Sequence, residues 1–527
     1  MYSTHAIGIY LGITDSCVAV YDNNQVKILL TDNIGNRSIK SCVAFDGSEF
    51  IVGNEAYNYI TYNPQNSIFD IKMLIGKTYS ELLTLKSQYQ WPFNIESDEN
   101  QRPMIRVTQN YLSEKFYPEQ IYAMLIAKLK HIAEATLEHL VTDAIISVPS
   151  TFNFVEREAV KLAASIAGLK SVRLIKEPLA AIIPSEIEKQ KKPAKDVAII
   201  HIGRTKSEVC ILTIEDLLFD TKSFNYCSDL NGDIFDEILV NHCVKKFKQI
   251  MKNEGIIIPS WSLKRLRKDC EKAKKILSFS HQTTIETNDL YQGIDFYYVL
   301  TRKEFEELCN QDFQRITPLL QDSLRGLEDV KIEKVLVIGG SAQIPKLQQL
   351  ISNFFPGIEQ KFLKDFQEFI AGGAAIFAAS LFRPKSDNFY NDFLLLDAVG
   401  LSLGIEDENG NLVQMVSRGT TLPIKREIDL KIKQNPVTIK IYEGEHKLAR
   451  NNLLIKELIF HRVNESSQIR VTLDIYADIT IDVKVQENGE GQNSIKEKLE
   501  NRKFSLPEIQ YMTSQNDKLL SRKLDSC

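Results

Sequence analysis

The chain has 527 residues, a length that predicts about three domains rather than one hydrophobic core. Its charged residues make up 25% of the sequence and its net charge is −5, so overall charge gives no reason to expect nucleic acid or an anionic membrane as a partner. The eight cysteines form no Cys-x-x-Cys pair, which favours reduced, buried thiols over disulfides or a zinc site. We therefore expect a protein of the cytoplasm, with the nucleus as a second compartment.

The start of the chain, MYSTHAIGIY, runs directly into a strand pattern and leaves no room for a signal peptide. The longest apolar run, residues 371–382, is too short to span a bilayer. We expect neither a signal peptide nor a membrane-spanning helix.

The first predicted elements are two strands within residues 7–20, IGIYLGITDSCVAV, joined by a tight turn at Gly12. Such a turn can bring backbone N–H groups up to a phosphate. Tyr10 and Ile13 are unexpected there, because a phosphate and its metal ion would require a carboxylate and a hydroxyl group.

Strand and helix patterns then alternate as far as about residue 385. Helices are predicted over 118–140, opened by a proline, and over 155–167, closed by Gly168. The segment 188–196, EKQKKPAKD, is predicted to be an exposed charged loop.

Two charged residues in this region could act on a phosphate. Lys72 lies in the otherwise apolar stretch FDIKMLIGK, and a lysine near a γ-phosphate stabilises developing charge. Glu177 precedes a proline in LIKEPLAA, and a glutamate can orient a metal-bound water. Taken singly, each could equally be an ordinary surface or partly buried charge.

An internal repeat links two parts of the chain about 190 residues apart. When Gly12 is set against Gly203, IGIYLGITDSCVAV aligns with AIIHIGRTKSEVCI, and Tyr10 falls on His201. A duplicated hairpin predicts two similar lobes that each offer one turn to a ligand. The alternative is a chance similarity between two apolar hairpins.

Two later segments could contact the same ligand. The four residues Glu271, Lys274, Lys275 and Ser278 share one helix face, which could hold a ribose and a base or could be a salt-bridged solvent face. Residues 335–341 read as a buried strand that ends in the turn Gly339-Gly340-Ser341, before a helix over 345–354. That turn could let a ligand approach the backbone or could be an ordinary strand-to-helix connection.

After residue 396 the pattern changes to short alternating runs such as VTIKIYEG and IRVTLDIYAD, separated by turn clusters such as DENGN. This pattern is typical of an antiparallel β domain. The last stretch, 506–527, is predicted to be one short polar helix with a tail.

Ten segments in chain order resemble the 70-kilodalton heat-shock chaperone family: IGIYLGITDSCVAVY, FDIKMLIGK, ISVPSTFN, AGLKSVRLIKEPLAA, EKAKKILS, LYQGIDFYYVLTRKEFEELC, VLVIGGSAQIPKLQQL, DFLLLD, LSLGIE and IYEGE. The resemblance covers about residues 6 to 515. It implies an α/β actin-like ATPase domain of two duplicated lobes, an all-β sandwich that binds peptides, and a short C-terminal helix. The corresponding bounds are 1–386 for the ATPase domain, 387–397 for a linker, 398–505 for the sandwich and 506–527 for a truncated lid helix and tail.

The resemblance also implies roles for single residues. Nucleotide contacts map to Gly12, Thr14, Gly203, Arg204, Thr205, Lys206, Glu271, Lys274, Lys275, Ser278, Gly339, Gly340 and Ser341. Catalytic positions map to Lys72, Glu177 and Glu208. An interdomain switch maps to Pro149, Arg157, Arg173, Leu394, Leu395 and Asp397, of which Arg173 and Asp397 match positions where J-domain co-chaperones engage.

The departures from the family fall on the phosphate chemistry. Family members carry aspartates where Tyr10 and His201 stand and a threonine where Ile13 stands, and the aspartates hold Mg²⁺ through waters. We expect ATP or ADP as the bound nucleotide, with Arg204 and Lys206 partly replacing the metal, no protein-held metal ion, and weak or absent hydrolysis.

The peptide domain departs as well. Its groove maps to Ile405, Leu430, Val437 and Ile439, and the two arch residues that close over a peptide appear as Glu408 and Lys433. Opposite charges at the arch could bridge the groove or disfavour apolar clients. With the lid reduced to about its first helix, we expect bound peptide to leave quickly.

The sequence favours an atypical, ATP-binding chaperone or chaperone regulator. The partners implied by the resemblance are unfolded or nascent polypeptides, a J-domain co-chaperone, a nucleotide exchange factor and the ribosome, with neither nucleic acid nor membrane expected. Two alternatives stay open: an active ATPase chaperone with rewired chemistry, and a nucleotide-independent scaffold.

Overall fold

The computed structural model describes residues 6–32, 35–47, 49–109, 112–186, 194–382, 393–430, 435–461, 468–487, 493–499 and 503–524. The chain divides into two compact units. The first comprises Met1–Pro193, Ile214–Lys222 and Gln367–Cys527, and the second comprises Ala194–Thr213 and Ser223–Phe366. Among the described helices, none is both long and apolar enough to cross a membrane.

The first unit is built around a mixed sheet of order β12-β11-β1-β2-β3, formed by Ser171–Lys176, Asp143–Val148, Ile7–Leu11, Asp15–Asp22 and Gln25–Ile28, with β4 (Ile39–Lys40) paired to β2. β1 pairs with β11 in parallel and with β2 antiparallel, so the predicted N-terminal hairpin is confirmed. Because β1 is central and buried on both faces, its run of apolar residues is continuous rather than alternating.

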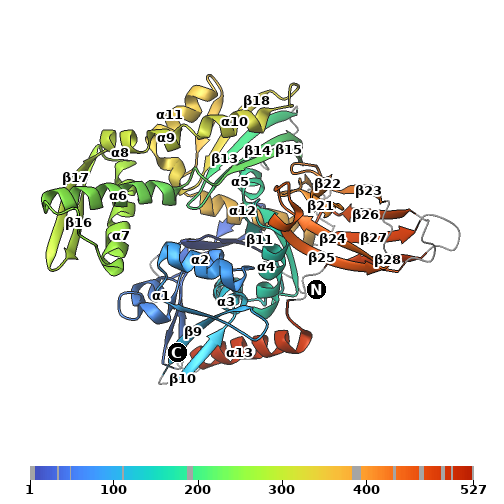
Figure 1. Ribbon diagram of the computed structural model, residues 1–527, viewed down its shortest axis with the longest axis horizontal. Helices are drawn as coiled ribbons and strands as arrows, with labels where there is room; N and C mark the ends of the chain where they lie inside the picture. The colour runs from blue at the N-terminus through green and yellow to red at the C-terminus, as the bar shows by residue number, and fades with distance from the viewer. Residues whose placement is uncertain are drawn as a thin grey trace. The chain divides into compact units, whose positions relative to one another are not determined.

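Smaller sheets and helices complete the α/β part of this unit (Figure 1). The sheets are β10-β9-β8, formed by Leu112–Phe116, Pro103–Gln109 and Asn94–Ser97, and β6-β5-β7, formed by Glu49–Val52, Val43–Asp46 and Ser67–Ile68. The helices are α1 (Asn54–Tyr59), α2 (Tyr79–Tyr89), α3 (Pro118–Leu137), α4 (Phe154–Ile166), α5 (Glu177–Glu186) and α12 (Phe366–Phe382). The predicted helix 118–140 stops earlier, because Glu138 takes a left-handed conformation.

The first unit also contains the predicted β domain. One sheet has the order β22-β21-β24-β25 (Leu412–Val416, Leu403–Glu406, Val437–Glu443, Leu453–Phe460), and the other has the order β23-β26-β27-β28 (Ile424–Leu430, Ile469–Ile475, Ile481–Glu487, Ser494–Lys498). Their inward-facing side chains form one hydrophobic cluster, in which alternate residues of β26 and β27 are buried. The prediction of an antiparallel β domain is confirmed.

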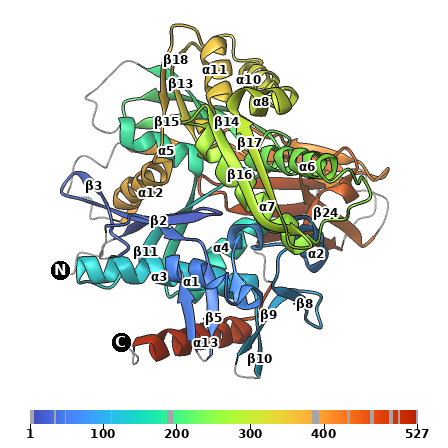
Figure 2. The ribbon, with the colours of Figure 1, turned by 90° about the vertical axis from the view of Figure 1, so that its left-hand side faces the viewer.

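Helix α13 (Leu506–Leu524) packs against α3, α4 and β6 of the same unit. Figure 1 and Figure 2 both show it lying along the α3 side of the α/β part rather than over the strands of the β domain. Phe504 and Met512 belong to the hydrophobic core that α3 and α4 also share. The C-terminal helix therefore contributes to the packing of the N-terminal α/β part.

The second unit repeats the topology of the first. Its sheet order, β19-β18-β13-β14-β15, places two parallel strands beside a hairpin just as β12-β11-β1-β2-β3 does, and consists of Glu359–Phe362, Ile332–Ile338, Lys195–Ile202, Ser207–Glu215 and Leu218–Cys227. A two-stranded hairpin, β16 (Gln282–Tyr291) with β17 (Ile294–Thr301), packs against helix α7 (Ser260–Leu277). The remaining helices are α6 (Gly232–Ile250), α8 (Arg302–Leu308), α9 (Asn310–Phe313), α10 (Ile316–Leu324) and α11 (Pro345–Phe354).

The predicted linker contains strand β20 (Leu394–Leu396), which pairs in parallel with the part of β15 that belongs to the first unit. Asp392 and most of the predicted loop 188–196 lie outside the described residues.

Candidate functional site

The two predicted phosphate turns have the same backbone geometry. In the first unit the Gly12 N–H donates to the Asp15 carbonyl at 3.0 Å, and in the second unit the Gly203 N–H donates to the Lys206 carbonyl at 3.0 Å. The serine that follows each turn, Ser16 or Ser207, is fully buried. The repeat inferred from sequence is thus a repeat in structure.

In the first turn, the ring of Tyr10 covers Gly12. A side-chain carbon built on Gly12 would lie 2.7 Å from the Tyr10 hydroxyl and 2.9 Å from its ring. Tyr10 is 7% exposed, and burial together with the nearby Glu177 raises the pKa of its hydroxyl well above the ordinary value. Position 10 therefore presents a neutral phenol at the turn.

The two candidate charges beside this turn pair with each other. Lys72 and Glu177 form a buried ion pair, and the Lys72 ammonium group lies 5.4 Å from the centre of the Tyr10 ring. The nearest acid of the turn itself, Asp15, accepts from Lys40 at 2.7 Å. Thr14 is exposed at the tip of the turn.

In the second turn, His201 contacts Glu208 rather than standing alone. His201 Nδ1 lies 3.0 Å from the Glu208 carboxylate, which is 2% exposed. Arg204 donates to Asp233 at 2.9 Å, so its charge is shared with an acid that the sequence analysis had not considered. Thr205 and Lys206 complete the turn through their carbonyl groups, which accept from Asn231 and Gly203.

The predicted adenosine-binding residues gather around the N-terminus of α6 in the second unit. Lys274 donates to the Gly232 carbonyl at 2.8 Å and forms an ion pair with Asp236 at 2.8 Å, and Ser341 donates to the Gly203 carbonyl at 3.3 Å. Burial raises the pKa of Asp236 to about 6 against the opposing effect of Lys274. The structure therefore brings Gly203, Lys274 and Ser341 together.

The other two charged residues predicted on this face of α7 pair with each other. Burial would raise the pKa of Glu271, but Lys275, Lys274 and Arg204 outweigh it and lower the pKa. Lys275 pairs with Glu271 at 2.6 Å, and Ser278 is the residue that caps the C-terminal end of α7.

The glycine turn after β18 leaves its backbone open. Gly339 has a φ of 106°, and a side chain there would collide with the Ile202 carbonyl and His201. A side-chain carbon on Gly340 would meet nothing within 4 Å. Glycine at these positions permits both the close packing and an approach of a ligand to the backbone.

Comparison with known proteins decides the family. A family model described as Hsp70 protein matches residues 6–524. The chain is 38% identical to a heat shock 70 kDa protein of Neurospora crassa, over 97% of this chain and 80% of that protein. It is 35% identical to the heat shock cognate 70 kDa protein 3 of Dictyostelium discoideum, over 92% and 78% of the two chains. This chain belongs to the Hsp70 family.

Hsp70 proteins are ATP-binding chaperones, so the fit of a nucleotide and of its metal ion can be judged on the residues present. In the second unit, the open turn at Gly340 and the cluster around Lys274 fit a nucleotide. In the first unit, Tyr10 is a neutral phenol and the acids Glu177 and Asp15 are each paired with a lysine. Because Mg²⁺ prefers carboxylate and water oxygens, this Hsp70 turn does not fit a bound magnesium ion.

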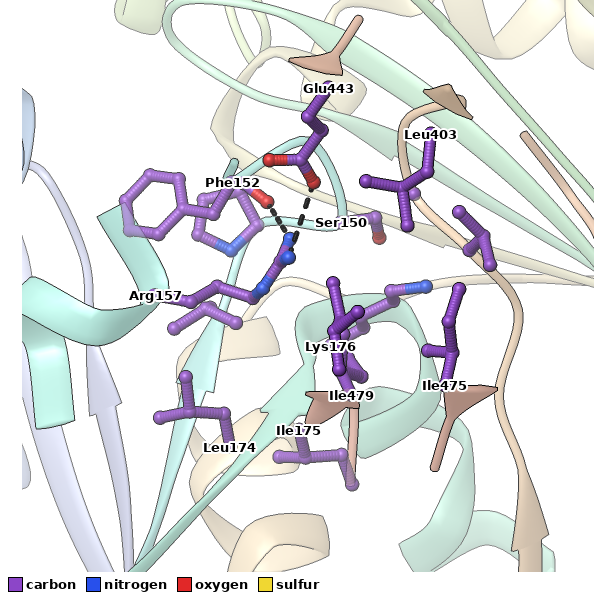
Figure 3. A pocket seen from close by; sticks show the side chains of 15 residues that line it. Ser150, Phe152, Arg157, Leu174, Ile175, Lys176, Leu403, Glu443, Ile475 and Ile479 are labelled. Carbon is purple, nitrogen blue, oxygen red and sulfur yellow. Dashed lines mark hydrogen bonds and ion pairs between the residues drawn. The ribbon is translucent and has the colours of Figure 1, made fainter. Parts of the chain in front are cut away.

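The predicted switch residues Arg157 and Asp397 each form an ion pair in the first unit, and Figure 3 shows the contacts of Arg157. Arg157 pairs with Glu443 at 3.2 Å and donates to the Phe152 carbonyl, and Lys176 pairs with Asp397 at 2.8 Å. All four charged side chains are at most 10% exposed. Arg157, Lys176 and Glu443 line a cavity of about 20 Å³ beside Pro149, which has room for about one water molecule.

The remaining switch residues are more exposed. Arg173 pairs with Asp478 at 3.3 Å, where both side chains are more than a third exposed. Leu394 and Leu395 lie in β20 and pair with Leu218 and Phe219.

The predicted peptide-groove residues are mostly enclosed. Ile405, Val437 and Ile439 are at most 2% exposed within the core of the β sandwich, Leu430 is partly buried, and Glu408 is exposed. Lys433 lies outside the described residues. The groove and the charged arch remain predictions.

Sequence reasoning missed the partners of several site residues. Asp233 and Asp236, which hold Arg204 and Lys274, stand one turn apart at the start of α6, a spacing that could have indicated a pair of acids on one face. Lys176 was overlooked although a lysine that ends a buried strand must find a partner. Glu443 gave no local signal, because its contact with Arg157 spans 286 positions.

Proposed function

We propose that this Hsp70-family chain is an ATP-binding chaperone, or a regulator of a conventional chaperone, with weak or absent ATP hydrolysis. The observation that carries the proposal is Tyr10, whose neutral phenol covers Gly12 where a metal-orienting carboxylate would be needed. Loss of metal positioning or of a catalytic proton-transfer group costs about 10² to 10⁴ in rate for each role.

Nucleotide binding is supported by the second unit, where Lys274 and Ser341 lie beside Gly232, Ser341 donates to Gly203, and the backbone of Gly340 is open. We propose that ATP or ADP binds there with little dependence on Mg²⁺. Arg204 contributes less charge than the sequence suggested, because it is paired with Asp233.

The partners and location follow from the family. We propose unfolded or nascent polypeptide as the client, a J-domain co-chaperone and a nucleotide exchange factor as partners, the ribosome as a site of action, and the cytoplasm, with the nucleus, as the compartment. The buried pairs Arg157–Glu443 and Lys176–Asp397 are compatible with retained coupling between the α/β part and the β domain.

A second candidate is an active ATPase chaperone with rewired chemistry. The observation that favours it is the Lys72–Glu177 pair, which keeps a lysine and a glutamate beside the first turn, together with Glu208 buried at the second turn. A nucleotide-independent scaffold would bind no nucleotide at all.

The test is single-turnover ATP hydrolysis with the full chain in excess, in which bound ATP and product are read from the same samples. The proposal expects bound but unhydrolysed ATP. Appreciable hydrolysis would favour the rewired ATPase, and failure to bind ATP or ADP would favour the scaffold.

A further inference from the structure

Most of the charged residues of helix α7 are positive. Within Ser260–Leu277 there are seven Lys and Arg residues against two acids, whereas the whole chain has a net charge of −5. The net charge of the chain therefore hides a strongly cationic helix in the second unit. Figure 2 shows α7 beside β16, the strand that covers its other side.

The outward positions of α7, continued by Phe279 in the turn that follows it, form a continuous stripe. Steps of three or four residues, which keep to one helix face, connect Trp261, Arg265, Lys268, Lys272, Ile276 and Phe279, and all six side chains are exposed. No acid occurs among these six positions. A solvated helix face usually mixes both signs of charge along such a stripe.

The central lysines of the stripe are uncompensated. Lys268 and Lys272 make no ion pair with any described residue, and neither neighbouring acid turns toward them: Asp269 accepts from Thr287 and Glu271 pairs with Lys275. Arg265 donates to the Asp289 carbonyl at 2.6 Å, and its guanidinium group lies 3.9 Å from the Asp289 carboxylate. The stripe therefore offers cationic groups to an external anion.

An exposed aromatic ring stands at each end of the cationic segment. Trp261 is 53% exposed and Phe279 is 73% exposed. They are separated by 18 positions, or about 27 Å along a helix axis. Each ring has a cation beside it, since Arg265 lies 4.4 Å from the centre of the Trp261 ring and Lys364 lies 5.8 Å from that of Phe279.

We propose that the stripe from Trp261 to Phe279 on α7 binds single-stranded RNA. Lysine and arginine groups along a face contact the phosphate backbone, and exposed aromatic rings stack on bases in a sequence-tolerant way. An acidic protein segment would satisfy Lys268 and Lys272 but would leave the two exposed rings without a matching group. The observations therefore favour a polyanion that also presents flat bases.

The first measurement is titration of the full chain with a labelled oligouridine of about 15 nucleotides at about 50 mM salt, followed by anisotropy and tryptophan emission. Three cations predict about a 20-fold loss of affinity between 50 and 200 mM salt. Trp261 should be quenched on binding, whereas Trp91, which is 2% exposed, should not respond. Absence of binding at the lower salt concentration would overturn the proposal.

Charge-reversal variants locate the site. Lys268→Glu with Lys272→Glu should weaken RNA binding about tenfold or more, because it removes two phosphate contacts and adds two negative charges. The matched control, Lys303→Glu with Lys346→Glu, makes the same charge change on other helices of the unit and should retain affinity within about twofold. Equal losses in both variants would contradict a specific stripe.

Two further outcomes separate RNA from an acidic protein. Trp261→Phe should abolish the quenching while retaining most of the salt-dependent affinity. Polyglutamate of similar charge should compete poorly. Binding without quenching, together with equal competition by polyglutamate, would replace RNA by an acidic protein segment and overturn the proposal.

Discussion

At position 10 a phenol lies where a nucleotide-bound metal ion would need a carboxylate. The ring covers Gly12, and its neighbours Lys72 and Glu177 satisfy each other's charge. Each of these groups has a partner without a metal ion. The residues at this turn thus preserve the hairpin, and position 10 presents a phenol in place of a carboxylate.

The substitution Tyr10→Asp should restore metal dependence. A carboxylate at this position would uncover Gly12 and provide an oxygen ligand, so ATP affinity measured by calorimetry should become about tenfold tighter in Mg²⁺ than in EDTA. Tyr10→Phe is the control, because its ring still covers Gly12 and the metal should have little effect. An aspartate variant with no metal response would contradict this role for position 10.

Removing one partner of the buried Lys176–Asp397 pair should destabilise the protein more than removing both. Lys176→Met leaves the buried Asp397 carboxylate with the Ala398 N–H as its one remaining donor among the described residues, and should lower the free energy of unfolding by about 3 kcal/mol in urea. The double variant Lys176→Met with Asp397→Leu should recover most of that loss, since no charge is left unpaired. Equal stability of the single and double variants would show that the pair is not desolvated.

At the scale of elements, the packing of α13 is a feature that the sequence did not predict. The helix was predicted from its resemblance to the beginning of a lid, and in the structure it packs against α3, α4 and β6. Arg102 donates to Asp98, Tyr117 and Glu508 and lies against the rings of Tyr117 and Phe504. No local pattern could predict a contact between positions 406 residues apart.

Arg102→Ala should release α13. Loss of these hydrogen bonds should increase amide hydrogen exchange across 506–518 by about tenfold, with little change in the β sandwich. Arg106→Ala, within the strand β9 that follows Arg102, is the matched control, because the pair of Arg106 with Glu96 involves no residue of α13. Similar exchange of α13 in both variants would refute the role of Arg102.

The contact between Arg102 and Glu508 also predicts that the stability of α13 depends on pH. Hydrogen bonds from Arg102 and from Ser505 lower the pKa of Glu508 to about 2, against about 4.3 in an unfolded chain. A lowered folded-state pKa stabilises the charged form, so its contribution is complete above about pH 4.3 and is lost as the pH falls toward 2. Exchange of α13 amides relative to those of β1 should rise in that window in wild type but not in Glu508→Gln.

At the scale of the whole molecule, the repeat, the hairpins, the β domain and helix 345–354 could be read from period, glycine and proline placement, because those signals are local. The orientation of Tyr10 over Gly12, the pairing of Arg204 with Asp233 and the packing of α13 could not, because each depends on residues brought together by the fold. The net charge of −5 likewise did not indicate that helix α7 is cationic, because it sums the charges of the whole chain.

The central claim is that the nucleotide-binding fold persists without a magnesium site. Calorimetric titration of the wild-type chain with ATP, in matched buffers containing Mg²⁺ or EDTA, tests it most directly. We predict binding with affinities that agree within about threefold, since Tyr10 offers the metal no carboxylate and the acids Glu177 and Asp15 are each paired with a lysine. ATP binding that requires Mg²⁺ would contradict the account.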